Sequence, residues 1–346
     1  KISVLIVDDS IFFRKALEQD LANDLHIEIV GSAVDADDAM KKIIELKPNV
    51  VTLDVEMPKV NGIQFLKKLM PTHPVAVVVV SGSPINALDA LDAGAVDFVK
   101  KPVIKTPKDR MDFVNELTLK IKIAATARIG RPQFTAPTPL TTPTLTTSSL
   151  SASSANNKVI AIGASTGGTE ATLEVIKNLP ANTPGIVITQ HMPAGFTKMY
   201  AERLDRICKM RVKEAENMDR VVQGQIIIGA GGFQMQLMKD SKGFYIKSQP
   251  GEKVSGHCPS VDVLFDSVSK CADTNSIGVL LTGMGSDGAN GLLAMRKKGA
   301  FTIGQDKETC VVYGMPMVAY NMGAVMKQLP LTAMPNEIIN QINKMR

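Results

Sequence analysis

The sequence predicts an α/β protein of two units, each built on a mainly parallel β-sheet that is covered by helices. In the N-terminal half, short runs of β-branched residues alternate with stretches in which apolar residues recur at helical spacing, and the C-terminal half shows strand–turn–helix units with glycine-rich turns. An uncharged segment rich in Thr, Ser and Pro separates the two halves. With 346 residues, of which 45% are hydrophobic, either half is long enough to bury a core of its own.

Five apolar runs in the N-terminal half predict the strands of a five-stranded parallel sheet. They are Ile2–Val7, Ile27–Val30, Val50–Leu53, Val75–Val80 and Ala95–Val99. Apolar residues at spacings of three and four predict helices between these strands. The first two helical faces are Phe13, Ala16, Leu17 and Leu21, and then Ala36, Met40, Ile43 and Ile44. In a sheet of this kind, ligands bind beyond the carboxyl ends of the strands.

Residues 134–157 read FTAPTPLTTPTLTTSSLSASSANN and carry no charge. A stretch of this composition cannot bury enough apolar surface to offset the entropy that is lost on ordering. We therefore predict a flexible linker over residues 131–157, between one domain at 1–130 and another at 158–346. In the second domain, strand–turn–helix units with glycine-rich turns predict a doubly wound, mainly parallel sheet.

Composition argues against several classes of protein. The longest apolar run, Val75–Val80, is far shorter than the roughly 18 residues needed to cross a bilayer, and no charged-then-apolar leader opens the sequence. We expect a cytoplasmic protein without membrane insertion. The net charge of +5 comes without a cluster of Lys and Arg, so no nucleic-acid partner is expected. The four cysteines have no C-x-x-C spacing, which argues against a disulfide framework or a zinc site.

Polar side chains gather at the predicted carboxyl edge of the N-terminal sheet. Asp8 and Asp9 follow the first strand, and Asp54 follows the third. Ser81 and Lys101 follow the fourth and fifth strands. Three clustered carboxylates repel one another unless a hard cation lies among them, and oxygen ligands of this kind suit Mg²⁺. Helix capping is the alternative for Asp9, but capping explains neither Asp54 nor Lys101.

Three motifs in this half resemble those of a two-component receiver domain, which has a flavodoxin-like fold with five parallel strands. They are VDDS at 7–10, TLDVEMPKVNG at 52–62 and DFVKKP at 97–102. The resemblance implies that Asp54 accepts a phosphoryl group from a histidine kinase. It also implies an Mg²⁺ site and residues that respond to phosphorylation. The implied metal ligands are Asp8, Asp9, Asp54 and the backbone carbonyl of Glu56, and the implied switch residues are Ser81, Phe98 and Lys101.

The C-terminal half opens with KVIAIGASTGG at 158–168, an apolar strand that runs into a glycine-rich turn before a helix. G-x-S-x-G in this setting can form a nucleophile elbow, which would present the hydroxyl of Ser165 at the sheet edge. A turn of this kind can equally cradle a phosphate, although the full G-x-G-x-x-G spacing and the P-loop lysine are missing. The motif alone leaves both interpretations open.

A serine nucleophile needs a base, and two histidines in this half are candidates. His191 follows the apolar run at 186–189, whereas His257 lies in the loop GHCPSVD, and either could be a structural histidine. The strand end at His191 should neighbour that at Ser165, so position favours His191 as the base. Asp287 lies in the turn after another buried strand, in IGVLLTGMGSDGANG. It could orient the imidazole or cap the helix that follows.

Together, the motifs GASTGG, QHMP, HCPSVD and LTGMGSDGANG resemble the catalytic domain of the chemotaxis protein-glutamate methylesterases. The resemblance implies Ser165 as the nucleophile, His191 as the base and Asp287 as the acid that orients it. It also places Thr166 beside the nucleophile and assigns the backbone N–H of Met284 to the oxyanion.

The same resemblance implies a phosphorylation-activated serine hydrolase that demethylates glutamate methyl esters on chemoreceptors, releases methanol and gives adaptation in bacterial chemotaxis. It further implies deamidation of specific receptor glutamines. Mg²⁺ would serve receiver phosphorylation only, and ester hydrolysis would need no cofactor. The implied partners are the cytoplasmic domains of methylated chemoreceptors and a chemotaxis histidine kinase, and we expect a monomer. Cys258 departs from the family, which usually carries a basic residue there, so the charge of the substrate surface differs at this point.

Three other functions stay open on the sequence alone. A non-catalytic response regulator would bind receptors or other partners through an enzyme-shaped domain, without turnover. A DNA-binding regulator would need a recognition helix with clustered Lys and Arg, which the sequence at 158–346 does not show. A hydrolase of small-molecule esters would need an enclosed apolar pocket near Ser165, whereas an esterase that acts on proteins needs an open cleft.

Overall fold

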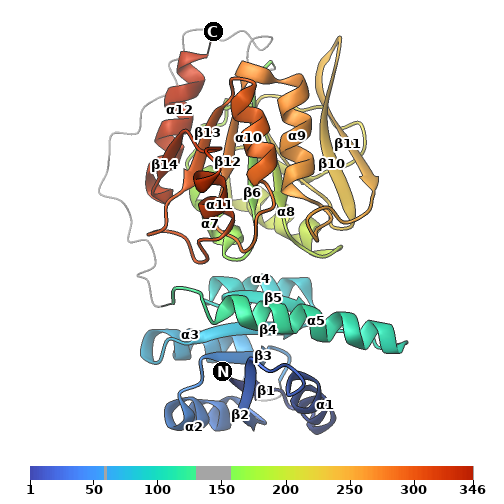
Figure 1. Ribbon diagram of the computed structural model, residues 1–346, viewed down its shortest axis with the longest axis vertical. Helices are drawn as coiled ribbons and strands as arrows, with labels where there is room; N and C mark the ends of the chain where they lie inside the picture. Colours follow the sequence, from blue (N-terminus) through green and yellow to red (C-terminus); the bar gives the residue numbers. More distant parts are fainter. Residues whose placement is uncertain (58–60, 130–156, 346) are drawn as a thin grey trace. The chain divides into compact units, whose positions relative to one another are not determined.

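A computed structural model describes residues 1–57, 61–129 and 157–345, and the chain divides into two compact units after Gln133 (Figure 1). Apart from its last residue, the predicted linker at 131–157 lies outside the described residues. Within the described ranges, no helix combines the length and the apolar character that a membrane span requires.

The first unit contains a five-stranded sheet in the order β2-β1-β3-β4-β5, and every neighbouring pair runs parallel. The strands are β1 (Ile2–Val7), β2 (Ile27–Ala33), β3 (Val50–Asp54), β4 (Ala76–Ser81) and β5 (Asp97–Lys100). The helices are α1 (Ile11–Leu21), α2 (Ala36–Leu46), α3 (Gly62–Thr72), α4 (Pro84–Asp92) and α5 (Pro107–Ala124). The predicted five-stranded parallel sheet is confirmed, with β3 and β4 each extending to the polar residue at its end.

Helices of this unit begin at polar caps and bury one apolar stripe. The hydroxyl of Ser10 caps α1 by accepting a hydrogen bond from the Phe13 N–H at 3.3 Å. The buried stripe of α2 consists of Ala36, Ala39 and Ile43. Ile44 was predicted on the same face but is 48% exposed. It follows Ile43 directly, so its side chain points about 100° further around the helix axis, away from the buried stripe. That part of the prediction is wrong.

The second unit contains a seven-stranded sheet in the order β14-β13-β12-β6-β7-β9-β8, again with every pair parallel. Its strands are β6 (Val159–Ala164), β7 (Gly185–Gln190), β8 (Arg211–Glu214), β9 (Gln225–Ile228), β12 (Ser276–Leu280), β13 (Phe301–Gln305) and β14 (Lys327–Leu329). A separate antiparallel hairpin is formed by β10 (Phe233–Asp240) and β11 (Gly243–Pro250). The doubly wound, mainly parallel sheet predicted for this half is confirmed.

Helices connect the strands of this second sheet. The α-helices are α7 (Gly168–Ile176), α8 (Phe196–Ile207), α9 (Val261–Cys271), α10 (Ala289–Lys297), α11 (Met315–Asn321) and α12 (Met334–Lys344), with short 3-10 helices at Asp273–Asn275 and Leu331–Ala333. The strand order reverses between β6 and β12, because β7 follows β6 on one side and β13 follows β12 on the other. Loops that leave adjacent strands in opposite directions open a crevice at the carboxyl edge, where α/β proteins bind ligands.

Helix α9 packs against β6, β10 and α10, and Figure 1 shows α9 and α10 side by side on the sheet. Its first residue, Val261, fills the space left by two glycines. A Cβ on Gly163 in β6 would overlap Val261 Cγ1, and a Cβ on Gly288 would lie 2.6 Å from the same atom. The helix can approach the sheet this closely only because neither position carries a side chain.

We expect Gly163→Ala to destabilise the second unit by about 1–3 kcal/mol, because the added methyl group must displace the fully buried Val261. Gly229→Ala is the matched control, since a Cβ there would meet its nearest neighbour at an ordinary 3.5 Å. Chemical unfolding followed by circular dichroism measures both variants. An equal loss of stability in the two would show that α9 shifts at little cost.

Candidate active site

Ser165 and His191 leave the second sheet side by side at its carboxyl edge. Strands β6 and β7 pair with Ala164 opposite Gln190, and these two residues directly precede Ser165 and His191. The His191 N–H donates to the Ala164 carbonyl at 3.1 Å. The Ser165 N–H donates to the carbonyl of Thr282, just beyond β12, at 3.0 Å. The predicted proximity of the two strand ends is confirmed.

A tight turn joins β6 to α7 at this serine. The Gly168 N–H donates to the Ser165 carbonyl at 2.7 Å, and Gly167 has a φ of 75°, in the left-handed region that favours glycine. The side-chain amide of Gln190 donates to the same carbonyl at 2.9 Å and so holds the turn from β7. A half-buried serine on a strand–turn–helix junction has the form of a nucleophile elbow.

His191 and Asp287 form a buried pair. His191 Nε2 lies 2.8 Å from Asp287 Oδ2, and Asp287 is only 2% exposed. Three more hydrogen bonds to this carboxylate come from the N-terminus of α9. The donors are Ser260 Oγ at 2.7 Å, the Val261 N–H at 2.8 Å and the Asp262 N–H at 2.9 Å. Asp287 does not cap α10, because the N-cap of that helix is Gly288, without a side-chain hydrogen bond.

The pKa of Asp287 lies below its ordinary value of 3.8. Burial is the largest influence and raises this pKa. The hydrogen bond and charge of His191, with the hydrogen bonds from Asp262 and Ser260, together outweigh it. The carboxyl group is therefore ionised at neutral pH and can stabilise a positive charge on the imidazole.

We expect Asp287→Asn to destabilise the start of α9 by about 2 kcal/mol at neutral pH, because a carboxylate that accepts three hydrogen bonds there is lost. Since the folded pKa lies below 3.8, this stabilisation is complete above the ordinary pKa and is lost as pH falls through the folded value. Hydrogen exchange of the Val261 and Asp262 amides should show a difference between parent and variant that shrinks in acid. Asp266→Asn on the same helix is the control, and a difference independent of pH would contradict the role of the charge.

The second ring nitrogen of His191, Nδ1, is buried and has no hydrogen-bond partner among the described residues. The structure therefore shows no hydrogen bond from this nitrogen to the hydroxyl of Ser165. In ligand-free enzymes this bond is often long and shortens only when substrate binds. Nδ1 is the ring nitrogen that is left to accept a proton.

Thr166 lies in the same turn as Ser165, whereas Met284 lies in the glycine-rich turn between β12 and α10. A Cβ on Gly283 would lie 2.6 Å from the Cβ of Ser165, so the next residue, Met284, has its backbone close to the serine. The Met284 side chain is 45% exposed. Thr166 is buried, and its carbonyl accepts a hydrogen bond from Thr282 Oγ1 at 3.0 Å.

Sequence reasoning assigned no supporting role to three residues around the pair: Gln190, Ser260 and His257. Ser260 had a local signal, because a serine before an apolar run is typical of a helix N-cap, and it caps α9. Its second bond, to Asp287, joins distant parts of the chain and has no such signal. His257 was considered as a base, but its ring instead stacks on that of His191.

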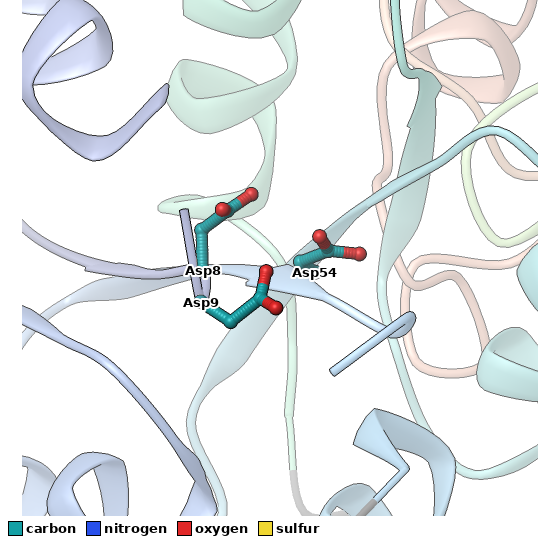
Figure 2. Close-up of side chains that lie close together, drawn as sticks. All are labelled: Asp8, Asp9 and Asp54. Carbon is teal, nitrogen blue, oxygen red and sulfur yellow. The ribbon is translucent and has the colours of Figure 1, made fainter. Parts of the chain in front are cut away.

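In the first unit, three carboxylates meet at the carboxyl edge of the sheet. Asp8, Asp9 and Asp54 each offer an oxygen, and these oxygens lie within 4.8 Å of one another (Figure 2). Asp8 and Asp54 are buried, whereas Asp9 is exposed, so the cluster is open to solvent on that side. This set of oxygen donors fits Mg²⁺.

Lys101 bridges two of these carboxylates. Its Nζ lies 3.0 Å from Asp8 Oδ2 and 2.5 Å from Asp54 Oδ2. Burial is the largest influence on the pKa of Lys101 and lowers it, but the bonds and charges of Asp54 and Asp8 outweigh burial and raise it overall. Burial raises the pKa of Asp8 in spite of Lys101. A bound cation would stabilise the charge of this carboxylate.

The other predicted residues of this unit lie around the cluster. The Glu56 N–H donates to Asp54 Oδ1 at 2.8 Å, and Ser81 Oγ donates to Glu56 Oε1 at 3.3 Å. Ser81 is buried at the end of β4, and Phe98 is buried in the neighbouring strand β5. Glu56 therefore contacts Asp54 directly, Ser81 contacts Glu56, and Phe98 lies in the strand next to that of Ser81.

Known proteins resemble this chain over its whole length. A family model described as CheB methylesterase matches residues 160–338, and one described as a response regulator receiver domain matches residues 4–109. The chain is 52% identical to protein-glutamate methylesterase/protein-glutamine glutaminase 2 of Syntrophomonas wolfei, over 100% of this chain and 99% of that protein. It is 43% identical to the protein-glutamate methylesterase/protein-glutamine glutaminase of Salmonella typhimurium, over 99% of this chain and 97% of that protein.

A solved structure supports the same assignment. The CheB methylesterase catalytic domain of Thermotoga maritima is 38% identical, with a TM-score of 0.52, and the match covers 53% of this chain and 97% of that one. The two family models account for the two units of this structure, each with a parallel sheet and polar residues at its carboxyl edge. The chain belongs to the CheB methylesterase family and joins a response regulator receiver domain to a methylesterase domain.

Proposed function

We propose that this chain is a phosphorylation-activated methylesterase that removes methyl esters from glutamate side chains of chemoreceptors and also deamidates specific receptor glutamines. The observation that carries the proposal is the buried His191–Asp287 pair beside Ser165, at the crevice where the strand order reverses. A serine, a histidine with a free ring nitrogen and an ionised acid are the groups that acyl transfer requires.

In this mechanism the hydroxyl of Ser165 attacks the γ-carbonyl carbon of a methylated glutamate. His191 takes the hydroxyl proton on Nδ1, because Nε2 is bonded to Asp287. Asp287 stays ionised and stabilises the imidazolium that forms. The backbone N–H of Met284 donates to the oxyanion, since Gly283 brings this residue against the serine.

The tetrahedral intermediate then collapses. His191 gives its proton to the methoxy oxygen, methanol leaves, and Ser165 carries a glutamyl ester. Water attacks this ester, His191 accepts a proton from the water, and the proton passes to the serine oxygen as the receptor glutamate is released. A glutamine side chain follows the same route, with ammonia as the leaving group. We propose no cofactor for this reaction.

The proposed phosphorylation site is Asp54, which would accept a phosphoryl group from a chemotaxis histidine kinase. The residues that would hold Mg²⁺ are Asp8, Asp9, Asp54 and the backbone carbonyl of Glu56. When bound, Mg²⁺ neutralises charge on the transferring phosphoryl group. The Asp54 carboxylate is the acceptor, and its Oδ1 already receives the Glu56 N–H at 2.8 Å.

Three residues would respond to the new charge. The Nζ of Lys101, which lies 2.5 Å from Asp54 Oδ2, would pair with the phosphoryl oxygens. The Ser81 hydroxyl, bonded to Glu56 at 3.3 Å, would turn from that carboxylate towards the phosphoryl group. Phe98, buried beside β4, is the aromatic switch of the receiver.

We assign residues 1–130 to the receiver, 131–157 to a linker and 158–346 to the esterase. Phosphorylation of the receiver would raise the rate of the esterase and so provide adaptation in chemotaxis. The partners are then the cytoplasmic domains of methylated chemoreceptors as substrate and the histidine kinase as phosphodonor, with the chain acting as a monomer.

Methanol release from membranes that carry methylated chemoreceptors tests this function. The protein should release methanol, and acetyl phosphate with Mg²⁺ should raise the rate, whereas membranes with unmethylated receptors should release none. A protein that binds the receptors but releases no methanol under either condition would be a non-catalytic response regulator. If methanol is released at the same rate with and without acetyl phosphate, the chain is an esterase, but its control by the receiver is overturned.

A further inference from the structure

The imidazole rings of His191 and His257 lie flat against each other, with centroids 3.6 Å apart and planes 7° from parallel. We propose that His257 is a positioning residue: its ring supports one face of His191 and holds it in the plane where Nε2 meets Asp287 and Nδ1 can take the serine proton. The catalytic part of this inference rests on the proposed function, whereas the stack of rings does not.

His191 needs such a support because its own bonds do not settle the plane of the ring. The torsion between Cβ and an aromatic ring is broad and roughly two-fold. The bond from Nε2 to Asp287 holds one corner of the ring, and Nδ1 has no partner within the described residues. A parallel ring in contact restricts tilting, which a single hydrogen bond leaves free. This matters because a misplacement of about 1 Å can lower a rate by about 10²-fold.

The loop that carries His257 is held firmly enough to act as a support. The His257 N–H donates to the Val254 carbonyl, and the Val254 N–H donates to the His257 carbonyl, both at 2.9 Å. The His257 carbonyl also accepts a hydrogen bond at 3.2 Å from the side chain of Gln234, which lies on β10. The position of this ring is therefore tied to the β10–β11 hairpin.

The same loop holds the acid of the pair. Gln234 Oε1 accepts a hydrogen bond from the Ser260 N–H at 2.9 Å, and Ser260 Oγ donates to Asp287 Oδ1 at 2.7 Å. One short segment thus contacts the imidazole of His191 through a ring and the carboxylate of Asp287 through a hydroxyl. The base and its orienting acid are positioned together.

His257 does not take the place of His191 as the base. Within the part of the chain that the structure describes, the Asp287 carboxylate accepts hydrogen bonds from His191, Ser260, Val261 and Asp262. The acid therefore orients His191. What His257 contributes is the position of that ring.

Two substitutions separate a flat support from other roles of His257. His257→Ala removes the ring and should lower kcat for methanol release by about 10–100-fold, with KM changed by less than about twofold. His257→Phe keeps a flat ring without nitrogen atoms and should restore kcat to within about threefold of the parent. If the Phe variant is as slow as the Ala variant, the ring nitrogens are needed and the proposal is wrong. An Ala variant as fast as the parent would also overturn it.

Nitrogen NMR of the His191 side chain in the full chain provides a readout that does not depend on activity. The parent and His257→Phe should carry the proton on Nε2, facing Asp287, whereas His257→Ala should show a mixture of tautomers and faster exchange of this proton. If this pattern is present and the parent releases no methanol, the proposed function fails and the positioning stands. If the parent releases methanol but the His191 spectra of the parent and both variants are the same, the positioning role of His257 is wrong and the proposed function is unaffected.

Val254→Ala is the matched control, because it alters an exposed side chain of the same loop and leaves the ring in place. It should match the parent in kcat and in the His191 spectrum. If it instead reproduces the effects of His257→Ala, the fold of the loop rather than the stacked ring is responsible, and the proposal is overturned.

Discussion

Ser165→Ala is expected to lower methanol release from methylated chemoreceptors by at least about 10³-fold, because the variant cannot form the glutamyl ester. The substitution should leave the fold intact. The turn around Ser165 is held through its backbone, whose N–H donates to Thr282 and whose carbonyl accepts from Gly168 and Gln190. None of these bonds uses the hydroxyl. The loss of rate therefore reports on chemistry.

Ser286→Ala is the matched control for this prediction, since it removes an exposed hydroxyl from the glycine-rich turn that carries Asp287. Its rate should stay within about twofold of the parent. A phosphonate probe for reactive serines should label the parent and the control but not Ser165→Ala. If Ser165→Ala releases methanol as fast as the parent, another residue is the nucleophile and the mechanism above is wrong.

Asp54→Asn is expected to abolish the response to acetyl phosphate, so that the ratio of rates with and without it falls to about 1. Asn is close to Asp in size but has no carboxylate oxygen that could form an acyl phosphate. Asp54 is buried, ends β3 and lies with Asp8 and Asp9 in the cluster of carboxylates. Its Oδ2 lies 2.5 Å from Lys101 Nζ, closer than that of Asp8 at 3.0 Å.

Labelled acetyl phosphate checks this prediction directly, because an aspartyl phosphate is lost in alkali. The parent should take up label and the variant should not. Asp37→Asn, which changes an exposed carboxylate on α2, is the control and should behave like the parent. Uptake of label and stimulation that survive in Asp54→Asn would place the phosphoryl group on a different residue.

The five strands of the first sheet, and the three strands of the second sheet that precede Ser165, His191 and Asp287, could be predicted because buried strands of a parallel sheet are apolar on both faces. Their limits were less accurate: β2 runs on to Ala33, and β5 begins at Asp97 rather than Ala95. The end of a strand is set by its hydrogen bonds with neighbouring strands, and the pattern of apolar residues does not show directly where those bonds stop. Ile44 was misplaced for a related reason, since a small difference in the rotation of α2 moves an apolar residue from the core to solvent.

The sequence by itself determined that Ser165, His191 and Asp287 each follow a buried strand, and a parallel sheet gathers such positions at one edge. Only the tertiary structure decided that β6 lies between β12 and β7, and which partners each side chain takes. Asp287 is bonded by the start of α9 rather than capping α10, and His257 stacks on His191. Both contacts arise because α9 and the hairpin pack together on the sheet and bring together residues far apart in the chain, so no local pattern of residues signals them.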